Sequence, residues 1–226
     1  MRDDPRSGER AIVGMNGNRK STRWWWVRHA PVTTSGGRIY GQRDVPADTS
    51  DPRPYEALAR WLPAGAVLVT SHLQRTVQTA DAIRAAGAAL PPPVAEPDLA
   101  EQNFGAWQGR PRDEVYAAFG EGNPFWAAPA TTRAPDGESF AYLVGRVGGA
   151  IERLTDAHAG RDIVAVTHGG TIRAAIGLAL GLSPEDSLRF RIDNCSLTRL
   201  DLLAPGAPSS GCWAVAHVNQ HVDAAP

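Results

Sequence analysis

Three short apolar runs, each followed directly by polar residues, restrict the fold of this chain more than any other feature. They read WWWV-RH from Trp24, AVLVT-SHLQR from Ala66 and DIVAVT-HGG from Asp162. An apolar run of about 4–8 residues without helix caps is typical of a strand buried on both faces of a sheet. Helical patterns follow the second and third runs, and strands that alternate with helices favour parallel pairing. We therefore expect a buried, mostly parallel sheet.

The remaining segments predict helices on that sheet and an antiparallel edge. Periodicity and capping residues indicate helices over residues 51–62, 71–87, 112–119, 137–160 and 169–181. Ser71 is the expected N-cap of the second helix, and Gly87 its stop. Residues 94–99 predict a short extended piece, and residues 189–203 with 212–219 predict an antiparallel pair. The expected fold class is α/β, a three-layer α/β/α sandwich with a mostly parallel central sheet.

The length of 226 residues suits a single domain. We place this domain over residues 23–226 and expect residues 1–22 to form a disordered tail. The only apolar run in the tail, AIVGM, is shorter than the ~7–15 residue core of a signal peptide. The longest apolar stretch, from Ala174 to Leu182, is well short of the ~20 residues that cross a bilayer. These features predict a soluble chain without membrane contact.

The charge balance argues against polyanionic partners. The chain has 23 Lys and Arg against 24 Asp and Glu, a net charge of -1, so it has no general attraction to nucleic acid. Any anion site must then be local. Cys195 and Cys212 are too few for a disulfide framework, which favours a cytoplasmic location. The oligomeric state stays open, a dimer included.

The polar residues behind the three runs should meet at one edge of the sheet. In open α/β sheets, ligands bind outside the carboxyl ends of the strands. This rule places four side chains in one crevice: Arg28, His29, Arg75 and His168. The second and third runs also open helices, and free N–H groups at a helix start, near Gly169 for the third, favour an anion. The crevice therefore suits a ligand with concentrated negative charge.

Two arginines and two histidines fit phosphoryl transfer, in which positioning and charge stabilisation do most of the work. His29 is the candidate nucleophile, because neighbouring guanidinium groups keep its imidazole neutral. Arg28 and Arg75 can stabilise the charge on the phosphoryl oxygens, as Mg²⁺ does in other proteins.

A carboxyl group is needed to protonate the leaving oxygen, and Glu101 is the candidate. It follows an extended segment and so lies on a loop at a strand end. Asp98 and Glu138 are competing acids. The six histidines show no HExxH or HxH spacing, so we expect neither a metal site nor a cofactor.

Five ordered motifs resemble those of the histidine phosphatases of the phosphoglycerate-mutase-like superfamily. VRHAP is similar to the family's R-H-G signature, SHLQRTVQTA to S-P-L-x-R-x-x-Q-T-A, LAEQNFGAWQG to L-x-E-x-x-F-G-x-W-E-G, DGESF to G-G-E-S, and THGGTIRA to T-H-G-G-x-I-R-A. The resemblance runs from Trp24 to about Asn219 and implies a phosphoglycerate-mutase-like fold. It also implies the phosphorylated nucleophile, the proton donor and the phosphate pocket, which are respectively His29, Glu101, and Arg28 with Arg75 and His168.

The loop GRIYGQRDVP looks like that of the α-ribazole phosphatase branch, which implies Tyr40 and Gly41 as substrate-binding residues together with Gly169. Pro31 and His72 depart from the family motifs, and their roles stay open.

These observations predict a metal-independent phosphomonoesterase that hydrolyses a small phosphorylated metabolite through a phosphohistidine intermediate. A mutase of the phosphoglycerate type is one alternative, and a non-catalytic phosphate-binding regulatory module is another. The family's mutases carry extra basic residues after their acid, which this chain lacks, and this difference favours hydrolysis. The identity of the phosphomonoester is not readable from the sequence.

Overall fold

A six-stranded mixed sheet forms the centre of the computed structural model, which describes residues 21–33, 36–117, 130–203 and 212–222. The strands are β1 (Thr22–Arg28), β2 (Val67–Thr70), β3 (Val94–Ala95), β4 (Asp162–Thr167), β5 (Leu197–Leu202) and β6 (Trp213–Gln220). Their order across the sheet is β3-β2-β4-β1-β5-β6. The first four run parallel, and β5 and β6 continue the sheet by antiparallel pairing. The predicted parallel core and its antiparallel edge are both confirmed.

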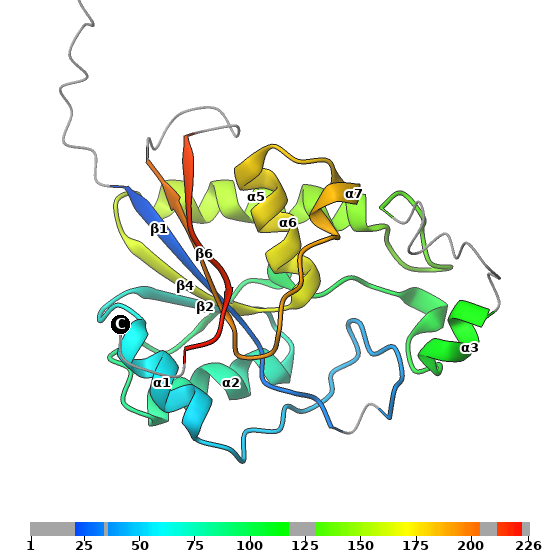
Figure 1. Ribbon diagram of the computed structural model, residues 1–226, viewed down its shortest axis with the longest axis horizontal. Helices are drawn as coiled ribbons and strands as arrows, with labels where there is room; N and C mark the ends of the chain where they lie inside the picture. The colour runs from blue at the N-terminus through cyan, green and yellow to red at the C-terminus, as the bar shows by residue number, and fades with distance from the viewer. Residues whose placement is uncertain (1–20, 34–35, 118–129, 204–211, 223–226) are drawn as a thin grey trace, which may run out of the picture.

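Helices cover both faces of the sheet. They are α1 (Arg53–Trp61), α2 (Gln74–Ala85), α3 (Arg112–Ala117), α5 (Phe140–Ala157), α6 (Gly169–Leu180) and α7 (Pro184–Ser187). Two 3₁₀ turns, η1 (Pro97–Leu99) and η2 (Gly105–Trp107), lie between β3 and α3. Figure 1 shows α5, α6 and α7 above the sheet and α1 and α2 below it. The three-layer α/β/α sandwich expected from the sequence is confirmed.

The three tryptophans of β1 face both layers of the core. Trp24 and Trp26 pack with α5 and α6, and their rings stack at 4.7 Å between centroids. Trp25 points to the opposite face, into the cluster formed with α1 and α2. The indole nitrogens of Trp24 and Trp25 donate to Thr155 Oγ1 at 3.1 Å and to Asp162 Oδ1 at 2.9 Å. Large rings on both faces therefore hold β1 rigidly at the centre of the sheet.

The strand register brings three loops to one edge of the sheet. Arg28, the last residue of β1, pairs with Thr167, the last residue of β4. Thr70, the last residue of β2, pairs with Val166. Because these strands are parallel and end together, the residues that follow them become neighbours although they are far apart in the chain.

Some element boundaries differ from the expectation. Helix α2 begins at Gln74 with Leu73 as its N-cap, so the prediction that Ser71 caps it is wrong. Instead, Ser71 Oγ lies 2.8 Å from His168 Nε2. Thr22, which we assigned to the tail, is the buried first residue of β1, while residues 1–20 lie outside the described residues. Within residues 94–99 only Val94 and Ala95 form a strand, and a 3₁₀ turn follows.

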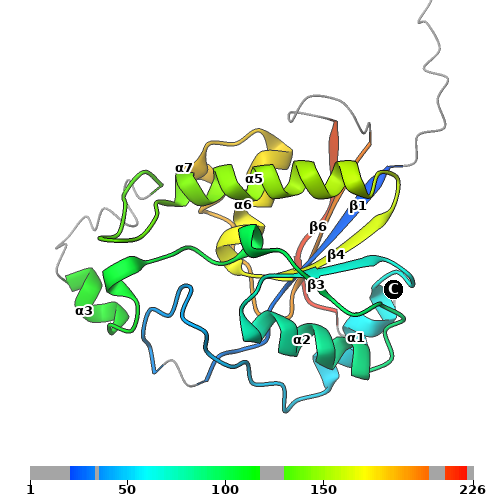
Figure 2. The ribbon, with the colours of Figure 1, turned by 180° about the vertical axis from the view of Figure 1, so that it is seen from behind.

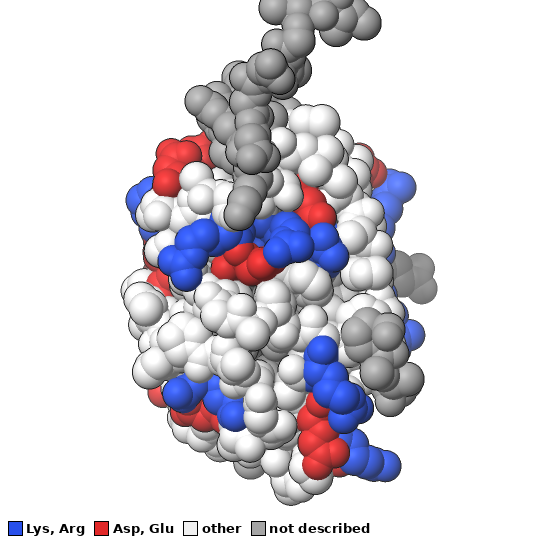
Figure 3. Space-filling model, turned by 90° about the vertical axis from the view of Figure 1, so that its left-hand side faces the viewer, with Lys and Arg blue, Asp and Glu red and all other residues white. Residues whose placement is uncertain are grey.

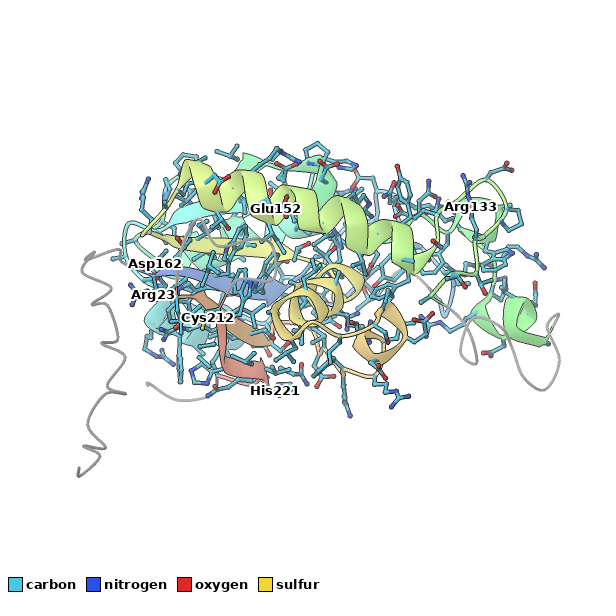
Figure 4. The ribbon with its side chains drawn as sticks, turned by 90° about the horizontal axis from the view of Figure 1, so that it is seen from above. Arg23, Arg133, Glu152, Asp162, Cys212 and His221 are labelled. Atoms are coloured by element: carbon cyan, nitrogen blue, oxygen red, sulfur yellow. The ribbon has the colours of Figure 1, made fainter. Side chains whose placement is uncertain are left out.

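Charged residues surround the opposite edge, where β1 and β4 begin. Figure 4 shows Arg23 and Asp162 together at this end, where they form an ion pair, and Arg133 at the other end of the molecule. On the same side, Figure 3 shows acidic and basic side chains interleaved rather than gathered by sign. Within the described residues, no helix has the length and apolar character to cross a membrane.

A glycine in α6 makes the packing of α6 on α7 testable. A Cβ at Gly177 would collide with Ser187 Oγ and lie 2.9 Å from Ser187 Cβ. Gly177→Ala should therefore lower the free energy of unfolding by ~1–3 kcal/mol, because overpacking outweighs the better helix propensity of alanine. The measurement is urea denaturation.

Gly145 in α5 is the matched control, because a Cβ there meets nothing within 4 Å. Gly145→Ala should raise the free energy of unfolding by ~0.5–1 kcal/mol. Equal effects of the two substitutions would contradict this account of the packing.

Candidate active site

His29 lies at the carboxyl end of β1 with only 1% of its surface exposed. Its backbone N–H donates to Thr167 O at 2.8 Å, and Asn194 Nδ2 donates to its carbonyl oxygen at 2.7 Å. The ring atom Nδ1 is 2.6 Å from Ala30 O. A carbonyl oxygen can only accept, so Nδ1 carries the hydrogen. In the neutral ring, Nε2 therefore keeps its lone pair.

His168, the residue between β4 and α6, is completely buried beside His29. The centroids of the two imidazole rings are 5.2 Å apart. Ser71 Oγ holds His168 Nε2 at 2.8 Å, and His168 Nδ1 is buried without a hydrogen-bond partner. Ser71 thus orients the second imidazole, a function that its predicted role as a helix cap did not include.

Carbonyl oxygens hold Arg28 and Arg75, and each arginine also has a buried Nε–H without a partner. Arg28 Nη1 donates to Ile192 O at 2.6 Å, and Arg75 Nη2 donates to Gly41 O at 2.6 Å. The Nε atoms of both arginines are buried without a partner. The Arg75 side chain is fully buried and lies over the Tyr40 ring at 5.0 Å. Two oriented N–H donors therefore remain for a ligand.

Burial and positive charge keep both imidazoles neutral. Burial, and after it the charges of Arg75 and Arg28, lower the pKa of His29 from 6.5 to about 3. Burial, and after it His29 and Arg75, hold the pKa of His168 well below 6.5. A neutral His29 with a free lone pair on Nε2 is competent to attack an electrophile.

Of the three candidate acids, Glu101 alone lines the cavity at this edge of the sheet. Its Oε1 accepts from Gln102 N at 2.9 Å, and its Oε2 accepts from Gly170 N, in the first turn of α6, at 3.3 Å. Asp98 pairs instead with Arg153, and Glu138 with Arg146.

The cavity has a volume of about 270 Å³. Of the predicted substrate-binding residues, Arg28, Tyr40, Gly41 and Gly169 line it, whereas Arg75 and His168 are fully buried and do not. The other lining residues are Ile39, Glu101, Gln102, Phe104, Arg112, Phe140, Gly170, Arg173 and Leu188. Gly41 takes φ +47, and a Cβ there would lie 2.9 Å from Gln102 O, so the position requires glycine. His72, whose position was open, is exposed.

Sequence reasoning missed Arg173. Its guanidinium is largely buried, and its Nε donates to Phe190 O at 2.7 Å. A Cβ at Gly169 would lie 3.4 Å from Arg173 Nη1 and would also be close to Arg28 Nε. The signal was present, because Arg173 belongs to the motif THGGTIRA, but only the histidine and glycine of that motif were assigned.

A second cavity, of about 470 Å³, shares no lining residue with the first. Asp51, Arg53, Cys195 and His221 are among its lining residues. Asp51 and Arg53 form an ion pair with each other, and burial raises the pKa of the Cys195 thiol to about 11. This cavity therefore lacks the activated groups of the smaller one. Within the described ranges, no three histidine, cysteine or acidic side chains are grouped as metal ligands.

Together, fold and site define an α/β protein whose parallel strands end at a cavity lined by arginines, beside two buried, neutral imidazoles. The chain belongs to the histidine phosphatase superfamily (branch 1), whose sequence model matches residues 24–215.

Relatives and solved structures agree with this membership. The chain is 31% identical to a probable phosphoglycerate mutase GpmB of Yersinia enterocolitica, over 84% of this chain and 88% of the relative. It is also 31% identical to the bifunctional protein Rv2228c of Mycobacterium tuberculosis, over 83% of this chain but only 52% of that protein. The mycobacterial glucosyl-3-phosphoglycerate phosphatase Rv2419c has a similar fold, with a TM-score of 0.77, 23% identity and coverage of 88% of this chain and 99% of that one. Membership of this superfamily supports an enzymatic activity for the chain.

The low pKa of His29 gives a testable dependence of stability on pH. Above pH 6.5 the folded and unfolded states both hold a neutral imidazole at this position. As the pH falls below 6.5, the unfolded state takes up a proton that the folded state does not, so stability decreases. The loss is at most ~1.4 kcal/mol per pH unit for one such group.

His29→Asn should therefore reduce the slope of unfolding free energy against pH between about pH 6 and pH 4, by up to ~1.4 kcal/mol per unit. Urea denaturation across this range measures the slope. An unchanged slope in the variant would show that His29 titrates normally in the folded state.

Gly170 tests the position of Glu101. A Cβ at residue 170 would collide with Glu101 Oε1 and lie 3.3 Å from its carboxyl carbon. Gly170→Ala should displace the carboxylate and reduce kcat/KM by ~10–100-fold, because small misplacements of reacting groups are costly. Circular dichroism should show a folded protein, because the atoms that must move are at the far end of the flexible Glu101 side chain. Full activity would contradict the placement of Glu101.

Proposed function

We propose that the protein is a phosphomonoesterase that transfers the phosphoryl group of a small metabolite to His29 and then to water. One observation carries the proposal: Arg28 Nε, Arg75 Nε and His168 Nδ1 are buried without partners around the neutral imidazole of His29. Buried polar groups are rarely left unpaired, and phosphoryl oxygens would satisfy all three. We assign the His168 hydrogen to Nδ1, with the Ser71 hydroxyl donating to Nε2.

In the first step, the Nε2 lone pair of His29 attacks phosphorus, and the bond from phosphorus to the ester oxygen breaks. Arg28 and Arg75 stabilise the charge on the equatorial oxygens. Glu101, in its protonated form, gives its proton to the leaving oxygen, so the product is a neutral alcohol.

In the second step, water attacks the phosphohistidine. The Glu101 carboxylate accepts the proton of the water as the new bond from oxygen to phosphorus forms. The bond between phosphorus and Nε2 breaks, inorganic phosphate leaves, and His29 is neutral again. The same carboxyl group thus acts as acid and then as base.

The shape and lining of the cavity support a small substrate. Its volume of about 270 Å³ is below the range usual for drug-sized ligands. Ile39, Phe104 and Phe140 add apolar surface beside the arginines, which suits a leaving group with an apolar part. α-Ribazole phosphate and sugar phosphates are both candidate substrates.

Mutase activity is the second candidate, and the relative named as a probable phosphoglycerate mutase favours it. A mutase must keep its phosphoenzyme from water until the product is rephosphorylated. The three residues after Glu101, which are Gln102, Asn103 and Phe104, carry no charge that could hold a phosphorylated intermediate. This feature supports hydrolysis.

The experiment is hydrolysis of p-nitrophenyl phosphate in EDTA. We expect turnover by the wild type and a loss of more than ~10³-fold in kcat/KM for His29→Ala, because the nucleophile is removed. His158→Ala, at the end of α5, is the matched control and should retain activity. Phosphate binding without turnover would instead indicate a regulatory module, and inhibition by EDTA would contradict the metal-independent mechanism.

A second assay separates the two enzymatic activities. The wild type is given 3-phosphoglycerate with 2,3-bisphosphoglycerate, and the products are followed by NMR. Release of inorganic phosphate from either ester agrees with a phosphatase, whereas formation of 2-phosphoglycerate would identify a mutase.

A further inference from the structure

Glu101 lies on the loop that follows the 3₁₀ turn η1, and the main chain here is held at every carbonyl from residue 98 to residue 101. All the donors are side chains of other elements. Arg146 donates to Asp98 O and Glu101 O, Thr167 and Thr171 to Leu99 O, Thr171 to Ala100 O, and Gln42 to Glu101 O. Figure 2 shows this stretch, between β3 and α3, passing beneath α5.

Arg146 of α5 uses all three guanidinium nitrogens in this arrangement. Nη1 donates to Asp98 O at 2.7 Å, and Nη2 donates to Glu101 O at 2.9 Å. Nε and Nη2 also bind the Glu138 carboxylate, at 3.1 Å and 2.6 Å. The side chain is 14% exposed and that of Glu138 is 9% exposed. Arg146 therefore ties two carbonyls of the loop to one buried ion pair.

Glu138 holds the other side of the same loop. Its Oε1 accepts from Asn103 N at 2.9 Å, and its backbone N–H donates to Asn103 O at 2.8 Å. Its carbonyl oxygen accepts from Gln102 Nε2 at 3.0 Å. The main chain is thus fixed immediately before and after Glu101, whose carboxylate accepts, among the described residues, hydrogen bonds from the N–H groups of Gln102 and Gly170.

We propose that Arg146 is a positioning residue which, through its ion pair with Glu138, holds the Glu101 carboxyl at the leaving oxygen of the substrate. The inference rests on the phosphatase reaction proposed above. A buried ion pair is a weak source of stability, because desolvation offsets most of the attraction. Its contribution here is geometric, since a planar guanidinium can bind two carbonyls and a carboxylate at once and an ammonium group cannot match that geometry.

Arg153 of the same helix provides a matched control. It contacts the side chains of Glu96 at 3.3 Å and Asp98 at 2.8 Å, and it is 56% exposed. It lies next to the same loop but donates to none of its carbonyls within the described structure. Removing it should leave Glu101 in place.

The experiment compares kcat/KM for two esters. This constant reports the steps up to the departure of the leaving group and does not include the later attack of water. p-Nitrophenyl phosphate has an acidic leaving group that needs little protonation, whereas glycerol 3-phosphate has an alcohol that requires it. Glu101→Gln is the reference for loss of the acid. It should affect glycerol 3-phosphate by ~10²–10⁴-fold and the aryl ester far less.

Arg146→Lys and the double variant Arg146→Met with Glu138→Met should reproduce this selectivity in weaker form. We expect a loss of ~10–100-fold for glycerol 3-phosphate and less than ~3-fold for p-nitrophenyl phosphate. The double variant leaves no unpaired buried charge, so it should unfold near the same urea concentration as the wild type. Arg153→Met should match the wild type with both esters.

Equal losses with both esters in a folded variant would overturn the positioning role, because a general structural defect does not distinguish leaving groups. Wild-type kinetics in the double variant would overturn it as well. A wild type that hydrolyses neither ester would remove the proposed phosphatase function, and this inference with it. That outcome is recognisable without any variant.

Discussion

The site depends on the guanidinium groups of Arg28 and Arg75. Both lie at the end of the sheet with a buried Nε, and no carboxylate among the described residues is bound to them. Carbonyl oxygens accept from Arg28 Nη1 and from Arg75 Nη1 and Nη2, and these neutral acceptors orient the arginines without removing their charge. In a low-dielectric pocket this charge acts strongly on its neighbours. Burial, and after it this charge, lowers the pKa of His29, so the imidazole is neutral, and the charge favours an anion in the cavity. In the reaction that we propose, this charge thus helps to keep the nucleophile His29 neutral and attracts the phosphoryl group.

Strand β1 holds Arg28 and His29 in fixed positions, so the charge at the site does not move. Trp24 and Trp26 pack into one helical layer and Trp25 into the other, so β1 cannot shift toward either face without opening a cavity. Parallel pairing with β4 then places His168 next to His29. Electrostatic preorganisation of this kind requires rigid groups, because a polar site that relaxes loses its stabilisation of developing charge.

Glu101, the proposed acid, is held in a different way from His29, the proposed nucleophile. His29 follows a strand, and its main chain is fixed by the backbone carbonyl of Thr167 and by the side chain of Asn194. Glu101 lies on an irregular loop, whose carbonyls are bound by side chains from α5, α6, β4 and the loop that contains Gln42. The division matches the proposed chemistry, in which His29 stays aligned with phosphorus while Glu101 exchanges protons with a leaving group and with water.

The sequence by itself determined the sheet, its parallel order and the meeting of Arg28, His29, Arg75 and His168 at one edge. Buried strands can be recognised from their apolar composition, and parallel strands necessarily end on the same side of the sheet. Only the tertiary structure decided which of Asp98, Glu101 and Glu138 faces the cavity, that Ser71 orients an imidazole instead of capping a helix, and that Arg173 lies at the site. Several of these outcomes depend on contacts between residues far apart in sequence, such as Ser71 with His168, which are 97 positions apart, and Asp98 with Arg153, which are 55 apart. Local patterns of propensity and hydrophobicity carry no information about such contacts.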